Sequence, residues 1–127
     1  MNKIRVYYED TDASGRVYHA NYLKYLERGR SNLIYKSKYN HQELLKKFNI
    51  IFVVKSLNIN YLKPAFFEDI IEVQTSLNLL SRVKLNFNQK LIRNNELLAD
   101  AEVIVIPVNT KGKIIKLNQE LYSFLKT

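Results

Sequence analysis

The sequence has no cysteine and no tryptophan, and it has only two histidines, His19 and His41, among its 127 residues. Without cysteine the chain has no thiol nucleophile and can form neither a disulfide scaffold nor a thiolate metal site. Three glycines and two prolines exclude collagen-like and low-complexity chains. No apolar run approaches the roughly 18 residues that span a bilayer, and acids stand where a signal peptide would be apolar. We therefore expect a cytoplasmic protein with no transmembrane segment.

The length and composition are those of one folded domain. Apolar residues make up 46% of the chain and charged residues 25%, which is close to the average for globular proteins. A chain of this size buries roughly two-thirds of the surface that its unfolded form exposes, which is enough for one core. No repeat or linker divides the sequence, so a single domain is expected over residues 1–127.

The net charge of +8 is concentrated in the first half of the sequence. Residues 1–63 hold 12 basic and 5 acidic side chains, whereas residues 64–127 hold 8 and 7. Such an excess fits nucleic acid, a phosphorylated ligand or an acidic partner. The chain also has 14 Lys and 14 Asn, a bias that codon composition explains equally well. No nucleic-acid-binding motif accompanies the charge, so we expect no nucleic acid partner.

Apolar and polar residues alternate with period two in the second half, which predicts strands with one buried face. The links near 80–82 and 93–96 are short, so the strands that they join should be antiparallel neighbours. A further strand is expected near the N-terminus. The predicted strands cover residues 4–8, 55–61, 71–79, 83–91 and 97–105.

Residues 18–35 change to helical spacing and predict the long helix that covers the apolar face of the sheet. Gly29 inside this helix indicates close approach of another backbone, namely the sheet. A shorter helix is expected over 40–48, with Asn40 as N-cap and Glu43 completing a capping box. Residues 119–125 predict a terminal helix. The fold class is therefore α+β, an antiparallel sheet wrapped around one long helix.

The densest polar stretch lies between the first strand and the long helix, where Glu9, Asp10 and Asp12 place three carboxylates within four residues. Acids at this place often cap a helix or form a turn. A hard cation is an alternative, but too few further oxygen ligands follow at regular spacing, and no metal site is expected. Catalysis by one of these carboxylates is the third possibility.

The run YEDTDASGRVYHANYLKYLERGR, residues 8–30, resembles the signature of hotdog-fold acyl-CoA thioesterases. The resemblance is to the 4-hydroxybenzoyl-CoA thioesterase group, and most closely to the branch associated with the bacterial Tol–Pal envelope system. Tyr61, Pro64-Ala65 and Asp69 fit the same branch. Arg16 and Gly29 depart from the pattern, which usually has a small or apolar residue and Ala there; Arg16 could alter the mouth of the pocket.

The resemblance implies Asp12 as the catalytic carboxylate, His19 as the residue whose backbone N–H polarises the thioester carbonyl, and Tyr18 as a pocket residue. An N–H at a helix N-terminus directs a fixed dipole at the developing oxyanion. An ionised Asp can act as the nucleophile or as a general base that orients water, and the sequence leaves both open. Gly15 either brings the loop backbone close to substrate or is an ordinary turn glycine.

Other polar residues of this region have plainer expected roles. Glu27 lies on the long helix, where a related thioesterase group has its catalytic carboxylate, but Asp12 competes for that role and Glu27 is interpreted as a structural or surface residue. Asp10 is expected to be a turn or network residue. No cofactor is expected. Dehydration of a hydroxyacyl thioester with His19 as catalyst is conceivable, although the Asp-Thr-Asp loop argues against it.

The resemblance also implies partners. Subunits of the family pair through their sheets, so we expect a homodimer or homotetramer, and an unpaired edge near Phe52 to Val54 would otherwise favour aggregation. The substrate is expected to be an acyl-CoA, and the basic side chains could attract coenzyme A phosphates or an acidic acyl carrier protein. The alternative function is a scaffold that binds acyl carrier protein or lipid-synthesis enzymes at the cell envelope. The basic candidates are Lys36, Lys38, Lys46, Lys47, Lys55, Lys63 and Arg82.

Overall fold

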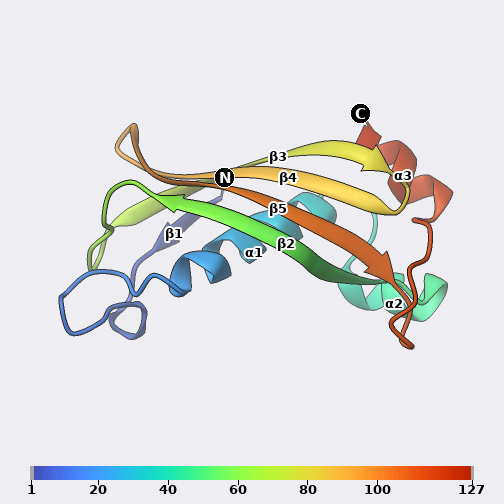
Figure 1. Cartoon of the computed structure of the whole chain (residues 1–127), viewed down its shortest axis with the longest axis horizontal. Helices are drawn as coiled ribbons and strands as arrows, with labels where there is room; N and C mark the ends of the chain where they lie inside the picture. Colours follow the sequence, from blue (N-terminus) through green and yellow to red (C-terminus); the bar gives the residue numbers. More distant parts are fainter. Residues whose placement is uncertain (1, 127) are drawn as a thin grey trace.

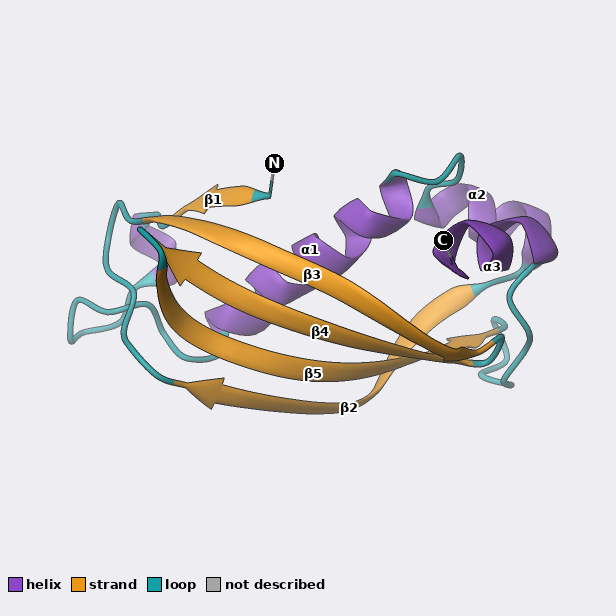
Figure 2. Cartoon of the chain, turned by 90° about the horizontal axis from the view of Figure 1, so that it is seen from above, coloured by secondary structure: helices purple, strands orange, loops and turns teal. Residues whose placement is uncertain are grey.

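A computed structural model describes residues 2–126, and in it one long helix lies on the concave face of a five-stranded sheet (Figures 1 and 2). The expected α+β class is confirmed. In chain order the elements are β1 (Lys3–Arg5), a 3-10 turn (Tyr8–Asp10), α1 (Asn21–Tyr35), α2 (His41–Phe48), β2 (Ile51–Tyr61), β3 (Ile70–Ser81), β4 (Lys84–Arg93), β5 (Glu96–Val108) and α3 (Gln119–Lys126).

The strand order is β1-β3-β4-β5-β2, with every neighbouring pair antiparallel. The two short links join β3 to β4 and β4 to β5, as predicted. Asn94 and Asn95 between β4 and β5 both have positive φ, 50° and 64°, which suits a tight hairpin turn. Strand β2 begins at Ile51, four residues before the predicted start, and lies at one edge of the sheet.

Helix α1 packs against the sheet at Gly29, as the sequence predicts. A Cβ at this position would lie 2.6 Å from Thr75 Oγ1 and 2.6 Å from Val73 Cγ1. Beside it, the buried Gln89 amide donates to the Leu26 carbonyl at 2.8 Å and to Thr75 Oγ1 at 2.9 Å. Polar groups buried in this way need partners, and Gln89 has them. The helix is therefore held close to β3 and β4.

Two predicted boundaries near the N-terminus are wrong. The strand expected over 4–8 ends at Arg5, because the Tyr7 N–H turns to the Asp10 carboxylate at 2.9 Å and a 3-10 turn follows. The long helix begins at Asn21 instead of residue 18. His19 therefore precedes the helix, two residues before its first helical residue.

Helix α2 begins with the predicted capping box. The Asn40 side chain accepts the Glu43 N–H at 2.9 Å, and the Glu43 carboxylate accepts the Asn40 N–H at 3.1 Å. Helix α3 is also confirmed, and Tyr39 donates to Glu120 at its start at 3.0 Å. Helices α2 and α3 therefore gather at the end of the sheet to which α1 points (Figure 2).

We expect Gly29→Ala to lower the free energy of unfolding by about 1–2 kcal/mol, because the overpacking cost exceeds the gain of roughly 1 kcal/mol in helix propensity. Urea denaturation followed by circular dichroism measures the change. Adding Val73→Ala removes one of the two clashes, so the free energy of unfolding of the double variant should fall by less than the sum of the decreases in the two single variants. Additive decreases would contradict this packing.

Candidate active site

The acidic loop is a short hairpin, and Asp12 is the first residue of its turn. Thr11 and Val17 pair as an isolated antiparallel bridge, and the Asp12 N–H donates to the Arg16 carbonyl at 2.9 Å. The Gly15 N–H closes the turn on the Asp12 carbonyl at 3.0 Å, and Gly15 has φ of +81°. Because no atom lies within 4 Å of a Cβ built there, backbone conformation and not space favours glycine.

The Asp12 carboxylate is exposed and is held by Ser14. Its Oδ1 accepts the Ser14 N–H at 2.8 Å and the Ser14 hydroxyl at 2.5 Å. The hydrogen bond from the Ser14 hydroxyl, followed by that from the Ser14 N–H, lowers the pKa of Asp12. The hydrogen bonds therefore orient Asp12 and keep it ionised.

Asp10 joins the loop to the start of α1. Its carbonyl accepts the Tyr18 N–H at 2.8 Å and the Asn21 side-chain amide at 2.8 Å. Its carboxylate accepts the Tyr7 N–H, as described above. The interpretation of Asp10 as a turn and network residue is confirmed, and these bonds set the position of the loop relative to the helix.

His19 lies directly before the N-cap of α1, Ala20. Its carbonyl accepts the Tyr61 hydroxyl at 2.9 Å, and its ring lies between those of Tyr18 and Tyr61, with centroid distances of 4.6 and 6.1 Å. Within residues 2–126, no acceptor receives the His19 N–H. This N–H at the positive end of α1 is available to a ligand oxygen.

A cavity of about 240 Å³ opens beside His19. Asp12, Gly15 and Tyr18 are not among the residues that line it, so Asp12 lies on the neighbouring hairpin and not in the cavity wall. Tyr18 is 46% exposed. The lining residues are Arg16, Val17, His19, Tyr22, Tyr61, Leu62, Lys63 and Pro64.

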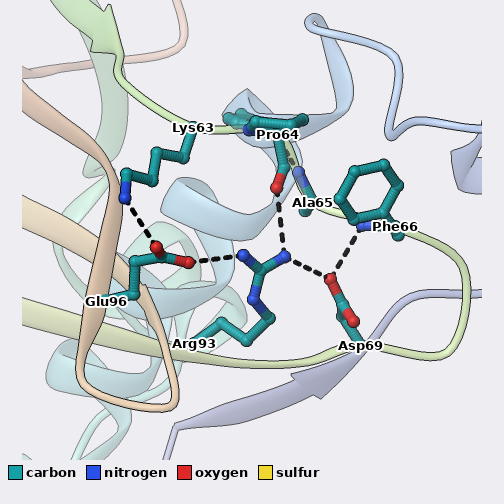
Figure 3. A network of polar contacts seen from close by, with 8 residues as sticks. Lys63, Pro64, Ala65, Phe66, Asp69, Arg93 and Glu96 are labelled. Carbon is teal, nitrogen blue, oxygen red and sulfur yellow. Dashed lines mark hydrogen bonds and ion pairs between the residues drawn. The ribbon is translucent and has the colours of Figure 1, made fainter.

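An ion-pair network centred on Arg93 supports the wall of this cavity (Figure 3). The Arg93 guanidinium contacts Asp69 at 2.7 Å, Glu96 at 2.6 Å and the Pro64 carbonyl at 3.1 Å. Lys63 contacts the other Glu96 oxygen at 2.7 Å, and the hydrogen bonds from Lys63 and Arg93 lower the pKa of Glu96. No motif in the sequence marks Arg93, although its partner Asp69 belongs to the pattern that resembles the family.

The segment held by Arg93 in turn contacts both the loop and α1. The Ala65 carbonyl accepts the Val17 N–H at 2.9 Å, and the Ala65 N–H donates to the Tyr22 hydroxyl at 3.1 Å. Burial raises the pKa of Tyr22. Residues distant in sequence thereby fix the loop, the helix and the cavity wall relative to one another.

A second cavity, of about 460 Å³, lies between α1, α2 and β2. Most of its wall is apolar, but Glu27, Ser31 and His41 form a polar group within it. Ser31 donates to Glu27, and its oxygen lies 3.0 Å from His41 Nε2. The four-residue spacing of Glu27 and Ser31 predicts that they share one face of the helix, but nothing in the sequence predicts that His41 lies beside them. The apolar lining comprises Ile34, Leu45, Ile50, Ile51, Phe52, Val54, Phe87 and Val105.

The basic excess lies at the end of the molecule remote from the Asp12 hairpin. Residues 36–48, 82–84 and 109–126 gather there around α2 and α3 (Figure 1), and they hold ten basic and two acidic side chains. The remaining residues hold ten of each. Of the basic candidates, only Lys63 lines the cavity beside His19.

Among residues 2–126, no group of three or more His, Cys, Asp or Glu side chains is arranged to hold a metal ion. None of the helices in that same range is both long enough and apolar enough to cross a membrane.

Known proteins place this chain in a family. Residues 6–125 match the thioesterase-like superfamily. The acyl-CoA thioester hydrolase YbgC of Escherichia coli is 38% identical over 107 residues, which cover 84% of this chain and 79% of that protein. The acyl-CoA thioesterase YbgC of Haemophilus influenzae is 41% identical over 106 residues, covering 84% and 78%.

Solved structures agree with this placement. A probable thioesterase from Bartonella henselae superposes with a TM-score of 0.88 at 32% identity, covering 91% of this chain and 96% of that one. The hotdog fold expected from the resemblance is thereby confirmed. With a profile match over almost its whole length and relatives at 38–41% identity, the chain belongs to the thioesterase-like superfamily.

Proposed function

We propose that this protein hydrolyses acyl-CoA thioesters, with Asp12 as the essential carboxylate and the His19 N–H as the donor to the thioester carbonyl. The observation that carries the proposal is the pairing of an oriented, ionised Asp12 with an unpaired N–H at the start of α1. The Asp10 carbonyl ties the hairpin that carries Asp12 to the start of α1, since it accepts from both Tyr18 and Asn21. The relatives named as acyl-CoA thioester hydrolases support the substrate class.

Each part of the reaction has a physical basis. Attack on the thioester carbon moves negative charge to the carbonyl oxygen, which a fixed N–H and the α1 dipole stabilise without reorganisation. Asp12 either attacks the carbon itself, releasing coenzyme A and leaving an anhydride that water hydrolyses, or removes a proton from an attacking water. In both routes one water is consumed per turnover, and the products are the free acid and the coenzyme A thiol.

Arg16 and Lys63 are the cations best placed to bind coenzyme A within one subunit, because both line the cavity beside His19. Arg16 also lies over the Phe66 ring, 5.9 Å from its centroid, which keeps its guanidinium at this wall. Phosphate groups would be attracted to this pair. Binding of an acidic acyl carrier protein has no comparable support here.

We further propose that two subunits pair through β2. This strand is an unpaired edge of 11 residues, and Val53, Val54 and Leu57 on it are 41%, 46% and 36% exposed. A long apolar edge of this kind is normally covered. Antiparallel pairing of two β2 strands would continue the sheet across a two-fold axis and close the larger cavity, which Phe52 and Val54 line.

Replacing Asp12 with Asn should reduce thioesterase turnover by about 10²–10⁴-fold while the circular dichroism spectrum stays unchanged. Hydrolysis of an acyl-CoA panel, followed by release of the free thiol, measures the loss. His19→Ala should retain most of the activity, because the proposed donor is its backbone N–H. An Asp12→Asn protein with full activity would exclude Asp12 as the essential carboxylate.

Replacing Ser14 with Ala should shift the acid limb of the kcat/KM profile to higher pH. The Ser14 hydrogen bonds lower the pKa of Asp12, so losing the hydroxyl raises that pKa and the carboxylate becomes protonated at a higher pH. Activity at neutral pH should change little. Ser123→Ala at α3 is the matched control, and an acid limb identical in all three proteins would show that Asp12 does not control it.

Replacing Val54 with Lys should convert the assembly to monomers, measured by analytical ultracentrifugation. Burying an unpaired ammonium group at the paired edge is unfavourable. Ile70→Lys, at a position 41% exposed near the opposite edge strand β1, is the control and should leave the assembly intact. A monomeric wild type, or a dimer that Val54→Lys does not weaken, would contradict pairing through β2.

A further inference from the structure

Tyr61 is the last residue of β2, and the sheet fixes its position. The next two N–H groups along the chain, those of Leu62 and Lys63, both donate to the Leu98 carbonyl of β5, at 2.8 and 3.0 Å. The Tyr61 ring packs against the Tyr22 ring with a centroid distance of 5.1 Å. Because backbone and ring are both held, the Tyr61 hydroxyl has a defined place between the end of the sheet and the start of α1.

The Tyr61 hydroxyl donates to the His19 carbonyl at 2.9 Å, and this is the shorter of two hydrogen bonds that the carbonyl accepts. The other comes from the Tyr22 N–H at 3.4 Å, which is longer than the usual range for such a bond. Ala20, the N-cap, offers no side-chain hydrogen bond to the first turn. Tyr61 is therefore the residue that ties this carbonyl to the sheet.

The bond from Tyr61 restrains the direction of the His19 N–H. The peptide plane that carries this N–H is held at its other end, because the Tyr18 carbonyl accepts the Asn21 N–H at 2.8 Å. The following peptide plane is held by Tyr61. Since each peptide is planar, holding one plane on either side of the His19 Cα leaves its φ and ψ little freedom. The N–H then keeps one direction without reorganisation during a reaction.

The Tyr61 hydroxyl proton is already used in this contact. A phenol has a single proton to donate, and the His19 carbonyl receives it. Partial burial raises the pKa of Tyr61, so the proton stays on the phenol oxygen at neutral pH. The bond also covers a carbonyl oxygen whose negative partial charge would otherwise oppose an oxyanion in the cavity that Tyr61 and His19 both line.

From these contacts we propose that Tyr61 is a positioning residue for thioester hydrolysis: its hydroxyl holds the His19 carbonyl and thereby keeps the His19 N–H directed at the thioester oxygen. The proposal rests on the proposed function, since it takes the His19 N–H as the donor. Tyr61 needs no contact with the substrate for this role. It connects the reaction centre to the end of β2, the strand through which we propose that the subunits pair.

The test replaces Tyr61 with Phe, which removes the hydroxyl and keeps the ring against Tyr22. We expect kcat for acyl-CoA hydrolysis to fall about tenfold, with KM within about twofold, because the donor is misdirected but still present. Tyr39→Phe is the matched control, since the Tyr39 hydroxyl donates a similar bond, at 3.0 Å, to Glu120. Both variants should have similar urea midpoints, and only Tyr61→Phe should lose kcat. An unchanged kcat in Tyr61→Phe, or equal losses in both variants, would overturn the proposal.

The pH dependence of kcat separates positioning from proton transfer. Tyr61→Phe should follow the wild-type profile at a uniformly lower level, because the hydroxyl neither gives nor takes the proton of the reaction. If the wild type has an alkaline limb that disappears in Tyr61→Phe, Tyr61 is an acid–base group and the positioning role is overturned.

NMR spectroscopy tests the same contact without turnover. S-Acetonyl-CoA is the probe, because it has a ketone near the sulfur and no thioester to hydrolyse. Its binding should move the His19 amide proton downfield in the wild type and by a smaller amount in Tyr61→Phe. Equal movement in both proteins would overturn the proposal.

Failure of the proposed function gives different results. A wild-type His19 amide that does not move on binding S-acetonyl-CoA would remove the donor itself, and the role of Tyr61 with it. Full activity in Asp12→Asn would remove only the carboxylate assignment. Absence of turnover on every acyl-CoA would refute the activity, and the amide shifts would then decide whether Tyr61 directs the His19 N–H.

Discussion

Helix α1 lies closer to the sheet at Gly29 than a side chain would permit, and the other functional features depend on that approach. Because a Cβ there would meet both Thr75 and Val73, the helix can occupy only one depth on the concave face. The buried Gln89 amide also prevents the helix from sliding, since its bond to the Leu26 carbonyl would be lost. With the helix so placed, its first turn meets the acidic hairpin and its last turns face α2 and β2.

Polar contacts between distant segments position the acidic hairpin relative to α1. Arg93, at the end of β4, holds the segment around Pro64, and Ala65 then bonds to both the hairpin and Tyr22 of α1. At one side of α1 these contacts leave the His19 N–H unpaired beside a small cavity. At the other side Ser31 joins Glu27 to His41 in a larger one. The two polar sites therefore lie at opposite ends of α1, and the apolar packing of the middle of the helix lies between them.

Much of the architecture was predictable because it depends on local spacing. Alternating residues located β3, β4 and β5, the short links required antiparallel pairing, and Asn40 with Glu43 predicted the start of α2. Boundaries were less predictable where side chains compete with the backbone. Tyr7 bonds to Asp10 and ends the first strand early. At the start of α1, Asn21 donates to the carbonyls of Asp10 and Tyr18. The hydrophobic periodicity of the sequence does not predict such bonds.

The sequence by itself determined the α+β class, the single long helix, the need for glycine at position 29 and the acidic loop that contains Asp12. These follow from residue type and spacing within one segment, which short-range sterics and hydrophobic periodicity control. Only the tertiary structure decided that His19 precedes the helix with its N–H unpaired, that Arg93 supports the cavity wall, and that His41 lies beside Ser31. The Arg93 contacts join segments 24 and 29 residues apart, and the Ser31–His41 contact joins two helices, so both depend on how the elements pack and not on local spacing. The same packing gathers the whole net charge at one end of the molecule, although the sequence spreads those basic residues from Lys36 to Lys126.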